Sequence, residues 1–168
     1  MSVATPRGVR RIDVKSARDM LAATQAETPR ADIFIAAAAV ADWRPVSESE
    51  QKIKKDGSGQ PPVLHFVENP DILATVARSA RAQSGALFCV GFAAESENLA
   101  ENAKAKRERK GIALLVGNIG PLTFGQDHNS LLLVDANGVR ELPRASKLAL
   151  ARQLVAEIAA RLPARRPP

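Results

Sequence analysis

Three continuous apolar runs constrain this chain more than any other feature of its sequence. They cover residues 31–41, 86–94 and 112–118, and segments with helical spacing over 69–83 and 96–110 separate them. A run that is apolar on both faces is typical of a strand buried on both sides in a parallel sheet. Strands that alternate with helices predict helices on both faces of that sheet. The sequence therefore predicts a three-layer, Rossmann-like α/β domain with a mostly parallel sheet.

The two ends of the chain add elements to this plan. Residues 9–14 predict a short strand, and Ser16 has the side chain of an N-cap for a helix through about Ala26. Residues 144–162 have the spacing of a closing amphipathic helix, and residues 163–168 predict a disordered tail. With 168 residues, the whole chain is expected to form a single domain.

Two β-hairpins are also expected. Residues 129–142 predict a hairpin with Asn137 and Gly138 at its turn, because an Asn-Gly pair between apolar stretches is a strong hairpin signal. Residues 52–55 and 63–68 flank a polar loop that contains glycine, and they predict a small hairpin. The expected fold is thus a parallel-sheet domain with a β-hairpin flap.

Charge and composition bound the class of partner. The formal net charge of +6 suits a phosphate-rich partner, which is either a nucleotide or nucleic acid. The basic side chains are scattered, aromatic residues make up only 4% of the chain and no nucleic-acid recognition motif is present. No apolar run approaches the roughly 20 residues of a membrane span, and the first residues lack a secretory signal. We expect a cytoplasmic protein without a specific nucleic-acid or membrane partner, and nucleic-acid binding stays an alternative based on charge alone.

The single cysteine and the two histidines offer little chemistry. Cys89 alone excludes an internal disulfide and a cysteine-rich metal site, and its place inside an apolar run predicts an inert core residue. His65 and His128 have no second histidine or cysteine at ligand spacing. We interpret both as structural.

Small and polar residues stand where each apolar run ends. The first run contains four alanines, residues 36–39, and the next two end in Gly91 to Glu95 and in Gly117 and Asn118. Because ligands bind at the carboxyl ends of parallel strands, small side chains there would let a ligand approach the backbone. The alternative is that the alanines let a helix pack closely on the sheet. The chain has neither a G-x-G-x-x-G fingerprint nor a Walker phosphate loop, so a nucleotide would bind by another device.

The sequence offers two such devices. A helix that starts with Asn69 as N-cap and Pro70 would aim free backbone N–H groups at an anion, although Asn-Pro-Asp is also an ordinary capping sequence. Lys106 and Lys110 are four residues apart and share one helix face, although a lysine-rich face is usually just solvated. Three further lysines could join them around a triphosphate as point charges: Lys52, Lys54 and Lys55.

Asp42 is the acidic residue that follows the alanines, with lysines nearby in sequence. Its carboxylate could hold Mg²⁺, which prefers a carboxylate together with phosphate oxygens, or it could bond a ribose hydroxyl. The alternative is that Asp42 merely caps the turn before Pro45.

Six motifs in register resemble one known family. They read AAAVADWRP, KIKK, NPDIL, VGFAAE, AKAKRERK and LLVGN, in this order, and the resemblance runs from about residue 8 to 162. The family is phosphopantothenoylcysteine synthetase, the synthetase part of the bifunctional Dfp flavoprotein of coenzyme A biosynthesis. It implies a phosphopantothenate–cysteine ligase that uses CTP and Mg²⁺ to convert the carboxylate of 4′-phosphopantothenate to an acyl-cytidylate, which the cysteine amine then attacks.

The resemblance also implies roles for individual residues. Lys52 would contact phosphates and is, with Asn118, a catalytic candidate, and Asp42 would bind the nucleotide and its metal. Positioning and charge neutralisation account for most of such chemistry, which suits a site with lysines and no obvious nucleophile. The residues placed around the nucleotide are Ala36, Ala37, Ala38, Asp42, Lys52, Pro70, Asp71, Ile72, Leu73, Phe92, Lys106 and Lys110.

The sequence departs from this family in two respects. The glycine-rich segment that opens the family's synthetases, and a downstream segment with an asparagine, are not found here. We therefore expect a truncated domain with an exposed sheet edge, a largely retained CTP site and impaired ligation. Gly117 and Ile119 flank Asn118 where the family usually has alanine and aspartate. A non-catalytic nucleotide-binding module is the alternative function.

Partners follow from the same resemblance. It implies CTP, 4′-phosphopantothenate and cysteine as small-molecule substrates, and a homodimer. It also implies a flavin decarboxylase domain, fused or separate, with no flavin in this chain.

Overall fold

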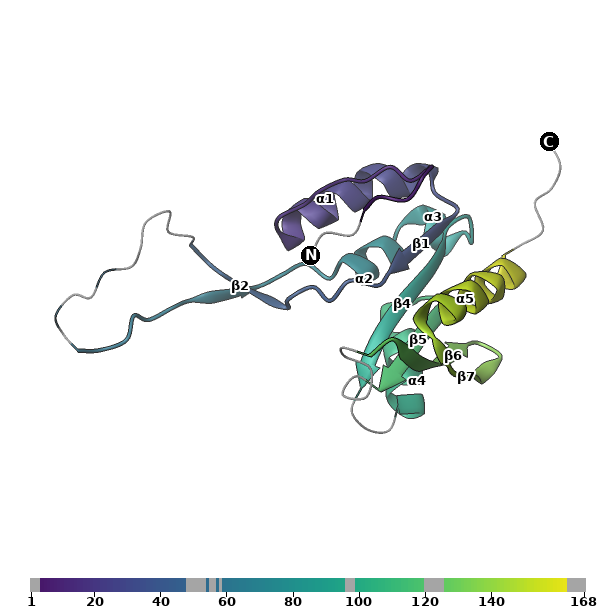
Figure 1. The fold of residues 1–168 in the computed structure, drawn as a ribbon. Helices are drawn as coiled ribbons and strands as arrows, with labels where there is room; N and C mark the ends of the chain where they lie inside the picture. Colours follow the sequence, from purple (N-terminus) through teal and green to yellow (C-terminus); the bar gives the residue numbers. More distant parts are fainter. Residues whose placement is uncertain are drawn as a thin grey trace. The chain divides into compact units, whose positions relative to one another are not determined.

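The computed structural model describes residues 4–47, 54, 57, 59–95, 99–119 and 126–162, and the chain forms two compact units. The first unit comprises Met1–Ala26 and Ala39–Ile72, and the second comprises Glu27–Ala38 and Leu73–Pro168. Figure 1 shows the helices and strands of both units and labels most of them. Each unit combines segments that are far apart in the sequence.

The second unit is built on a five-stranded sheet. Its strands are β1 (Ile33–Ala36), β4 (Phe88–Glu95), β5 (Leu114–Ile119), β6 (His128–Asp135) and β7 (Gly138–Ser146). Their order across the sheet is β1-β4-β5-β6-β7. β1, β4 and β5 are parallel, while β6 is antiparallel to both of its neighbours. Four of these five strands therefore run the same way, which confirms the predicted mostly parallel sheet.

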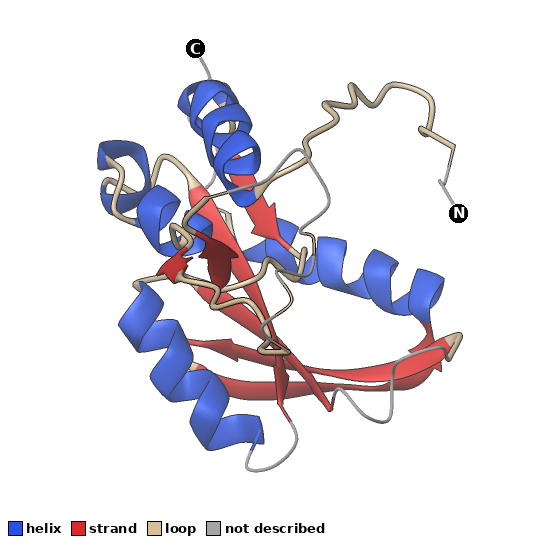
Figure 2. Ribbon diagram, turned by 90° about the vertical axis from the view of Figure 1, so that its left-hand side faces the viewer, coloured by secondary structure: helices blue, strands red, loops and turns tan. Residues whose placement is uncertain are grey.

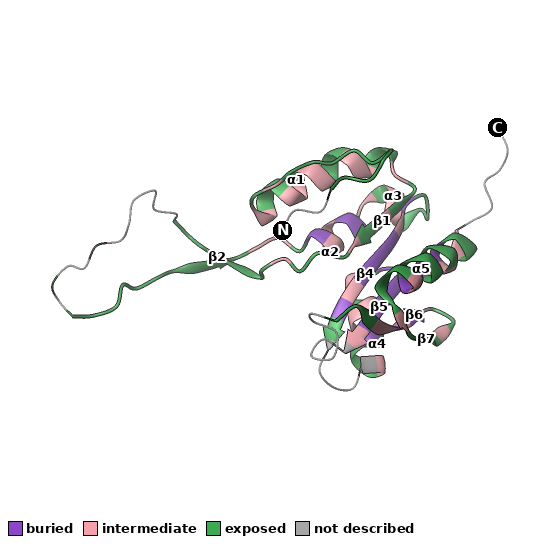
Figure 3. Ribbon diagram, viewed as in Figure 1, coloured by how far each residue is buried: buried purple, intermediate pink, exposed green. Residues whose placement is uncertain are grey.

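Helices cover both faces of this sheet (Figure 2). One face packs against α2 (Ile72–Ala77), α3 (Ala80–Gln83) and α4 (Leu99–Lys110), and the other packs against α5 (Lys147–Arg161). Successive residues of a strand point to opposite faces, so Cys89 joins the core with Val76 and Ala103, and Val90 joins the core with Leu154. The buried positions concentrate along these contacts (Figure 3). The predicted three-layer arrangement is confirmed.

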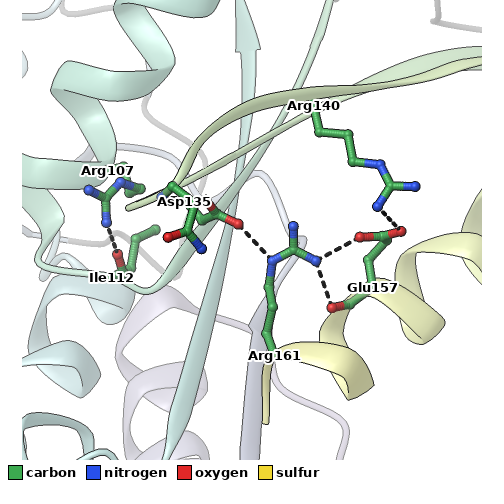
Figure 4. Close-up of polar contacts among 7 residues, drawn as sticks. Arg107, Ile112, Asp135, Arg140, Glu157 and Arg161 are labelled. Atoms are coloured by element: carbon green, nitrogen blue, oxygen red, sulfur yellow. Dashed lines mark hydrogen bonds and ion pairs between the residues drawn. The ribbon is translucent and has the colours of Figure 1, made fainter.

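A polar network fastens α5 to the β6–β7 hairpin (Figure 4). Arg161 Nε lies 2.8 Å from Asp135 Oδ2, and Arg161 Nη1 lies 2.7 Å from Glu157 Oε2. Arg140 of β7 approaches the second Glu157 oxygen at 2.7 Å. The backbone N–H of Asn137 donates to Asp135 Oδ1 at 2.8 Å. This bond tightens the turn, so the two turn residues are 136 and 137, one position earlier than predicted, and Gly138 already pairs with Asp135.

The first unit contains most of α1 (Ala17–Glu27) and a two-stranded antiparallel ribbon of β2 (Trp43–Pro45) and β3 (Phe66–Glu68). Ser16 Oγ accepts from the Asp19 N–H, and Asp19 Oδ2 accepts from the Ser16 N–H, which confirms the predicted N-cap. The separate ribbon confirms the predicted flap. Its strand partners differ from the prediction, because β3 pairs with residues 43–45, while most of residues 52–55 lie outside the described part of the chain.

Two predicted elements at residues 9–14 and 69–83 are wrong in detail. Residues 9–14 are not a strand, because no described segment pairs with them and Val9 and Ile12 are exposed. The predicted helix over 69–83 begins only at Ile72 and breaks before Ser79, whose Oγ accepts from the Ala82 N–H and starts α3.

β1 is an edge strand rather than a central one in the described sheet. It pairs only with β4, and it ends at Ala36, well before the predicted residue 41. Ile33 and Ile35 are 37% and 43% exposed. Among the described strands, β1 therefore forms one edge of the sheet.

The helix connecting α1 to β1 is a short 3-10 turn, η1 (Thr28–Arg30). In the part of the chain that the structure describes, no helix has both the length and the apolar character to cross a membrane.

Burial of Cys89 gives a first testable consequence. Its side chain is buried, and burial raises the pKa of the thiol to about 11. The reactive thiolate is therefore depleted, and we expect native protein at pH 8 to react with a disulfide reagent more than about a hundredfold slower than a free thiol. The absorbance of the thiolate released from the reagent gives the rate of the reaction. The same chain in denaturant is the control. Equal rates in both states would show that Cys89 is accessible.

Candidate nucleotide site

The first unit contains an open pocket of about 490 Å³. Four of its residues come from the segment that includes the end of β3 and the start of α2, one comes from β2 and one from α1. The lining residues are Arg18, Arg44, Glu68, Asn69, Pro70 and Asp71. We call this the Arg44 pocket. It brings the predicted residues Pro70 and Asp71 together with two arginines.

Arg44 and Asn69 organise one wall of the Arg44 pocket. Arg44 Nη1 donates to the Glu68 carbonyl at 2.7 Å and to Asn69 Oδ1 at 3.1 Å. Asn69 Nδ2 donates to the Ala41 carbonyl at 2.8 Å, and the Asn69 backbone N–H donates to the Asp42 carbonyl at 2.7 Å. Asn69 therefore links the backbone at Ala41 and Asp42 to residues 68–71, which line the pocket.

These contacts change the predicted role of Asn69. Its side chain bonds Arg44 and Ala41, and α2 begins only at Ile72, so Asn69 is not the N-cap of that helix. α2 is also only six residues long, which leaves it a weaker dipole than the predicted continuous helix. The predicted anion-binding site at this helix N-terminus is therefore reduced to the backbone and side chains of Pro70 and Asp71.

The strand ends of the second unit assemble a second group of predicted residues. Ala36, the last residue of β1, is in register with Gly91, while β4 continues for four more residues. Ala94 of β4 is in register with Asn118 of β5. The predicted edge of small and polar residues at the carboxyl ends is present. Two further predicted residues, Ala37 and Ala38, follow β1 directly and are exposed.

Several predicted contacts are packing residues in the structure. Ile72 is 8% exposed, and a Cβ placed on Gly91 would lie 2.6 Å from Leu73 Cδ2, so Leu73 packs directly on β4. Phe92 packs against the core on the α5 face. Any contact of Ile72 or Leu73 with a nucleotide would therefore use the backbone rather than the side chain.

Lys106 and Lys110 lie on the buried side of α4. Both are half-buried, whereas Lys104 is exposed, and Ala103 on the same side is fully buried. These two side chains are therefore less open to solvent than that of Lys104.

Asp42 and the loop lysines complete the predicted set. Asp42 is exposed and follows Ala41 in the stretch that Asn69 holds. Lys54 is exposed, while Lys52 and Lys55 lie outside the described residues. Among the described residues, no group of three or more His, Cys, Asp or Glu side chains gathers around a metal position. A single carboxylate with phosphate oxygens fits Mg²⁺, so the prediction for Asp42 stands as a prediction.

Sequence reasoning did not find Arg18, Arg44 or Glu68 as site residues. Arg44 lies inside the motif AAAVADWRP, but its hydrogen-bond partners Glu68 and Asn69 are distant in the sequence. A single sequence does not reveal contacts over such a separation. The tripeptide Trp43–Pro45 offered a local signal. Its arginine stands between a tryptophan and a proline, which both disfavour a helix.

Comparisons with known proteins agree on one family. Residues 1–162 match the family described as DNA/pantothenate metabolism flavoprotein C-terminal domain. The coenzyme A biosynthesis bifunctional protein CoaBC of Haemophilus influenzae is 40% identical over 160 residues, which cover 94% of this chain and 39% of that protein. CoaBC of Escherichia coli K12 is 39% identical over 165 residues, which cover 96% of this chain and 40% of that protein. The chain thus spans about two fifths of the curated relatives it matches.

Solved structures give the same fold. The crystal structure of the C-terminal domain of CoaBC matches with a TM-score of 0.73 and 28% identity, covering 95% of this chain and 69% of that one. A Cab2 variant in complex with phosphopantothenate-cysteine matches with a TM-score of 0.67 and 17% identity, covering 88% of this chain and 51% of that one. Together with the sequence matches, they show that this chain belongs to the DNA/pantothenate metabolism flavoprotein C-terminal domain family.

Proposed function

We propose that this chain is the CTP-dependent ligase part of coenzyme A biosynthesis, joining 4′-phosphopantothenate to cysteine through an acyl-cytidylate. The observation that carries the proposal is the bond pair from Asn69, which joins the Asp42 stretch to the Pro70 and Asp71 wall of the Arg44 pocket. These are the segments that the family resemblance assigns to the nucleotide. The CoaBC relatives, which are coenzyme A biosynthesis proteins, support this pathway, and the Cab2 variant has the same fold in complex with phosphopantothenate-cysteine.

The chemistry of the Arg44 pocket suits the base and ribose of a nucleotide. Its guanidinium groups donate hydrogen bonds, and its Glu68 and Asp71 carboxylates accept them. Cytosine and ribose present both donors and acceptors, whereas a triphosphate presents acceptors alone. We therefore assign the base and ribose to this pocket.

The residues of the chain would act mainly by positioning. Lys106 and Lys110 would neutralise phosphate charge. Asp42 would hold Mg²⁺, which when bound neutralises the phosphates and orients pyrophosphate as the leaving group. Lys52 and Asn118 are the candidates for contact with the reacting acyl phosphate. With these groups fixed, the carboxylate and the nucleotide phosphate meet at high effective concentration.

A homodimer is part of this proposal. The β2–β3 ribbon and its flanks carry large apolar side chains that are mostly exposed, and a two-stranded ribbon is marginally stable on its own. A second copy of the chain would bury this surface. The residues concerned are Trp43, Val46, Val63, Leu64, Phe66 and Val67.

Binding of CTP tests the proposed function. We expect calorimetry with Mg²⁺ to show CTP binding that is preferred over ATP, and we expect Asp42→Asn and Lys106→Ala each to weaken it about tenfold by removing one charge-assisted contact. Lys104→Ala, on the exposed side of α4, is the matched control and should change affinity less than about twofold. Equal binding of CTP and ATP, or losses equal to that of the control, would contradict the proposed site.

Pyrophosphate release separates the ligase from a non-catalytic nucleotide-binding module. A ligase releases pyrophosphate from CTP only when 4′-phosphopantothenate is present. Binding of CTP without such release would identify the chain as a nucleotide-binding module.

A further inference from the structure

The geometry points to Arg44 and Asn69 as positioning residues of the nucleotide site, acting as a pair that fixes the direction in which the Asp42 side chain leaves the backbone. The inference rests on the proposed function, because Asp42 matters here as a nucleotide or metal ligand. Neither residue belongs to the set that the family resemblance assigns. All atoms concerned lie within the first unit.

Arg44 determines which way the Asn69 amide faces. A guanidinium has only donors, so the Asn69 atom 3.1 Å from Arg44 Nη1 must be the oxygen. The other amide atom, Nδ2, then has to be the one that meets the Ala41 carbonyl at 2.8 Å. Without Arg44, Asn69 Oδ1 would lose this donor, and the bond to the Ala41 carbonyl alone would hold the amide in place.

Asn69 in turn holds both peptide groups that flank the Asp42 Cα. Its side chain bonds the carbonyl of Ala41, and its backbone N–H bonds the carbonyl of Asp42 at 2.7 Å. The orientation of these two peptide planes sets φ and ψ of Asp42, and hence the direction in which its Cβ points. Among the described residues, no side chain or backbone group hydrogen-bonds the Asp42 carboxylate itself, so its direction depends on the backbone.

The same pair, Arg44 and Asn69, also fixes the other side of the site. Glu68, whose carbonyl also accepts from Arg44 Nη1 at 2.7 Å, immediately precedes Asn69, and Pro70 immediately follows it. The proline ring fixes φ near −65°, so the placement of Asn69 carries over to Asp71. The β2–β3 ladder spans only three residue pairs, and the Arg44 bonds strengthen it at its last pair, Trp43 with Glu68.

Nucleotide titrations of the wild type and four variants test the role of the Arg44–Asn69 pair. Arg44→Met removes the donor, Asn69→Ala removes the amide, and the double variant removes both. We expect each single variant to bind CTP about tenfold more weakly, and the double variant to bind no more weakly than the worse single variant, because the two residues act in series. Arg152→Met removes an equal charge from an exposed position on α5, and should change affinity less than about twofold.

A conservative variant separates positioning from folding. Arg44→Lys keeps a donor on a shorter stem, and we expect an intermediate loss of CTP affinity with an unchanged melting temperature. It also serves if Arg44→Met does not fold. An affinity equal to that of wild type in both Arg44 variants would overturn the inference while leaving the proposed function intact, and so would losses that multiply in the double variant.

Hydrogen exchange of backbone amides tests the Arg44–Asn69 pair in the absence of nucleotide. The Asn69 backbone N–H donates to the Asp42 carbonyl, and we expect its hydrogen exchange to be about tenfold faster in Arg44→Met than in wild type or in Arg152→Met. Unchanged exchange at Asn69 would overturn the inference. If the wild-type chain binds no CTP, the proposed function fails, and this inference fails with it.

Discussion

Replacing Arg161 by methionine is expected to lower the free energy of unfolding at pH 7 by about 2 kcal/mol, because the variant leaves two poorly exposed carboxylates without their shared cation. The side chains of Asp135 and Glu157 are 14% and 16% exposed. Methionine keeps most of the apolar stem, so the loss reports the charge and the hydrogen bonds rather than a cavity. Urea unfolding at constant pH measures it.

The loss should depend on pH. Burial would raise the pKa of Asp135, but hydrogen bonds from Arg161 and from the N–H groups of Asn137 and Gly138 outweigh it, and the pKa lies below its ordinary value. A carboxyl with a lowered pKa contributes stability above its unfolded pKa of about 3.9 and loses it as the pH falls through the folded value. The difference between wild type and Arg161→Met should therefore shrink below about pH 4.

Arg140→Met is the matched control for Arg161→Met. Arg140 bonds the same Glu157, but its side chain is 62% exposed, and water screens such a pair. We expect this variant to lose no more than about 0.5 kcal/mol. Losses of equal size in the two variants, or a loss in Arg161→Met that does not change between pH 7 and pH 3, would contradict a role for the buried network.

Replacing Gly91 by alanine is expected to destabilise the second unit by about 1–3 kcal/mol, because the added methyl group has no space. A Cβ there would lie 2.6 Å from Leu73 Cδ2, 2.8 Å from Ile112 Cδ1 and 3.2 Å from Leu115 Cδ1. Ile112 and Leu115 are buried and have little room to move. Thermal unfolding measures the change as a fall in melting temperature of roughly 3–10 °C.

A second substitution shows whether the clash is the cause. Leu73→Ala removes the nearest of the three side chains, and we expect Gly91→Ala to cost about 1 kcal/mol less in that background than in the wild-type background. Additive losses in the double variant would show that the contact with Leu73 is not the source of the cost, which would then lie with Ile112 and Leu115.

The elements of the second unit were largely predictable from the sequence. The apolar runs at residues 86–94 and 112–118 are continuous, as expected of strands covered by helices on both faces, and they predicted β4 and β5. β1 was predicted as a strand but not as an edge strand, because its apolar side chains do not show which neighbour covers them. The break between α2 and α3 was missed because Ser79 is neutral in a helix pattern and becomes a cap only through its bond to Ala82.

The candidate site was predictable only in part. The resemblance named Pro70 and Asp71, and both line the pocket. Asn69 was interpreted as a cap, because an Asn-Pro-Asp sequence is a local pattern, whereas its partners Ala41 and Arg44 come from a distant stretch. Side chains that bond across such a separation leave no periodic trace in one sequence.

The hairpin and closing helix at the end of the chain also bear on the order of folding. β6 and β7 join through a two-residue turn, and α5 follows β7 directly, so their contacts close short loops. β1 must instead find β4, with Ile33 opposite Phe88, across a long intervening segment. Loop closure of that length costs more conformational entropy before any contact stabilises it. We therefore expect the C-terminal hairpin with α5 to form early and β1 to join the sheet last.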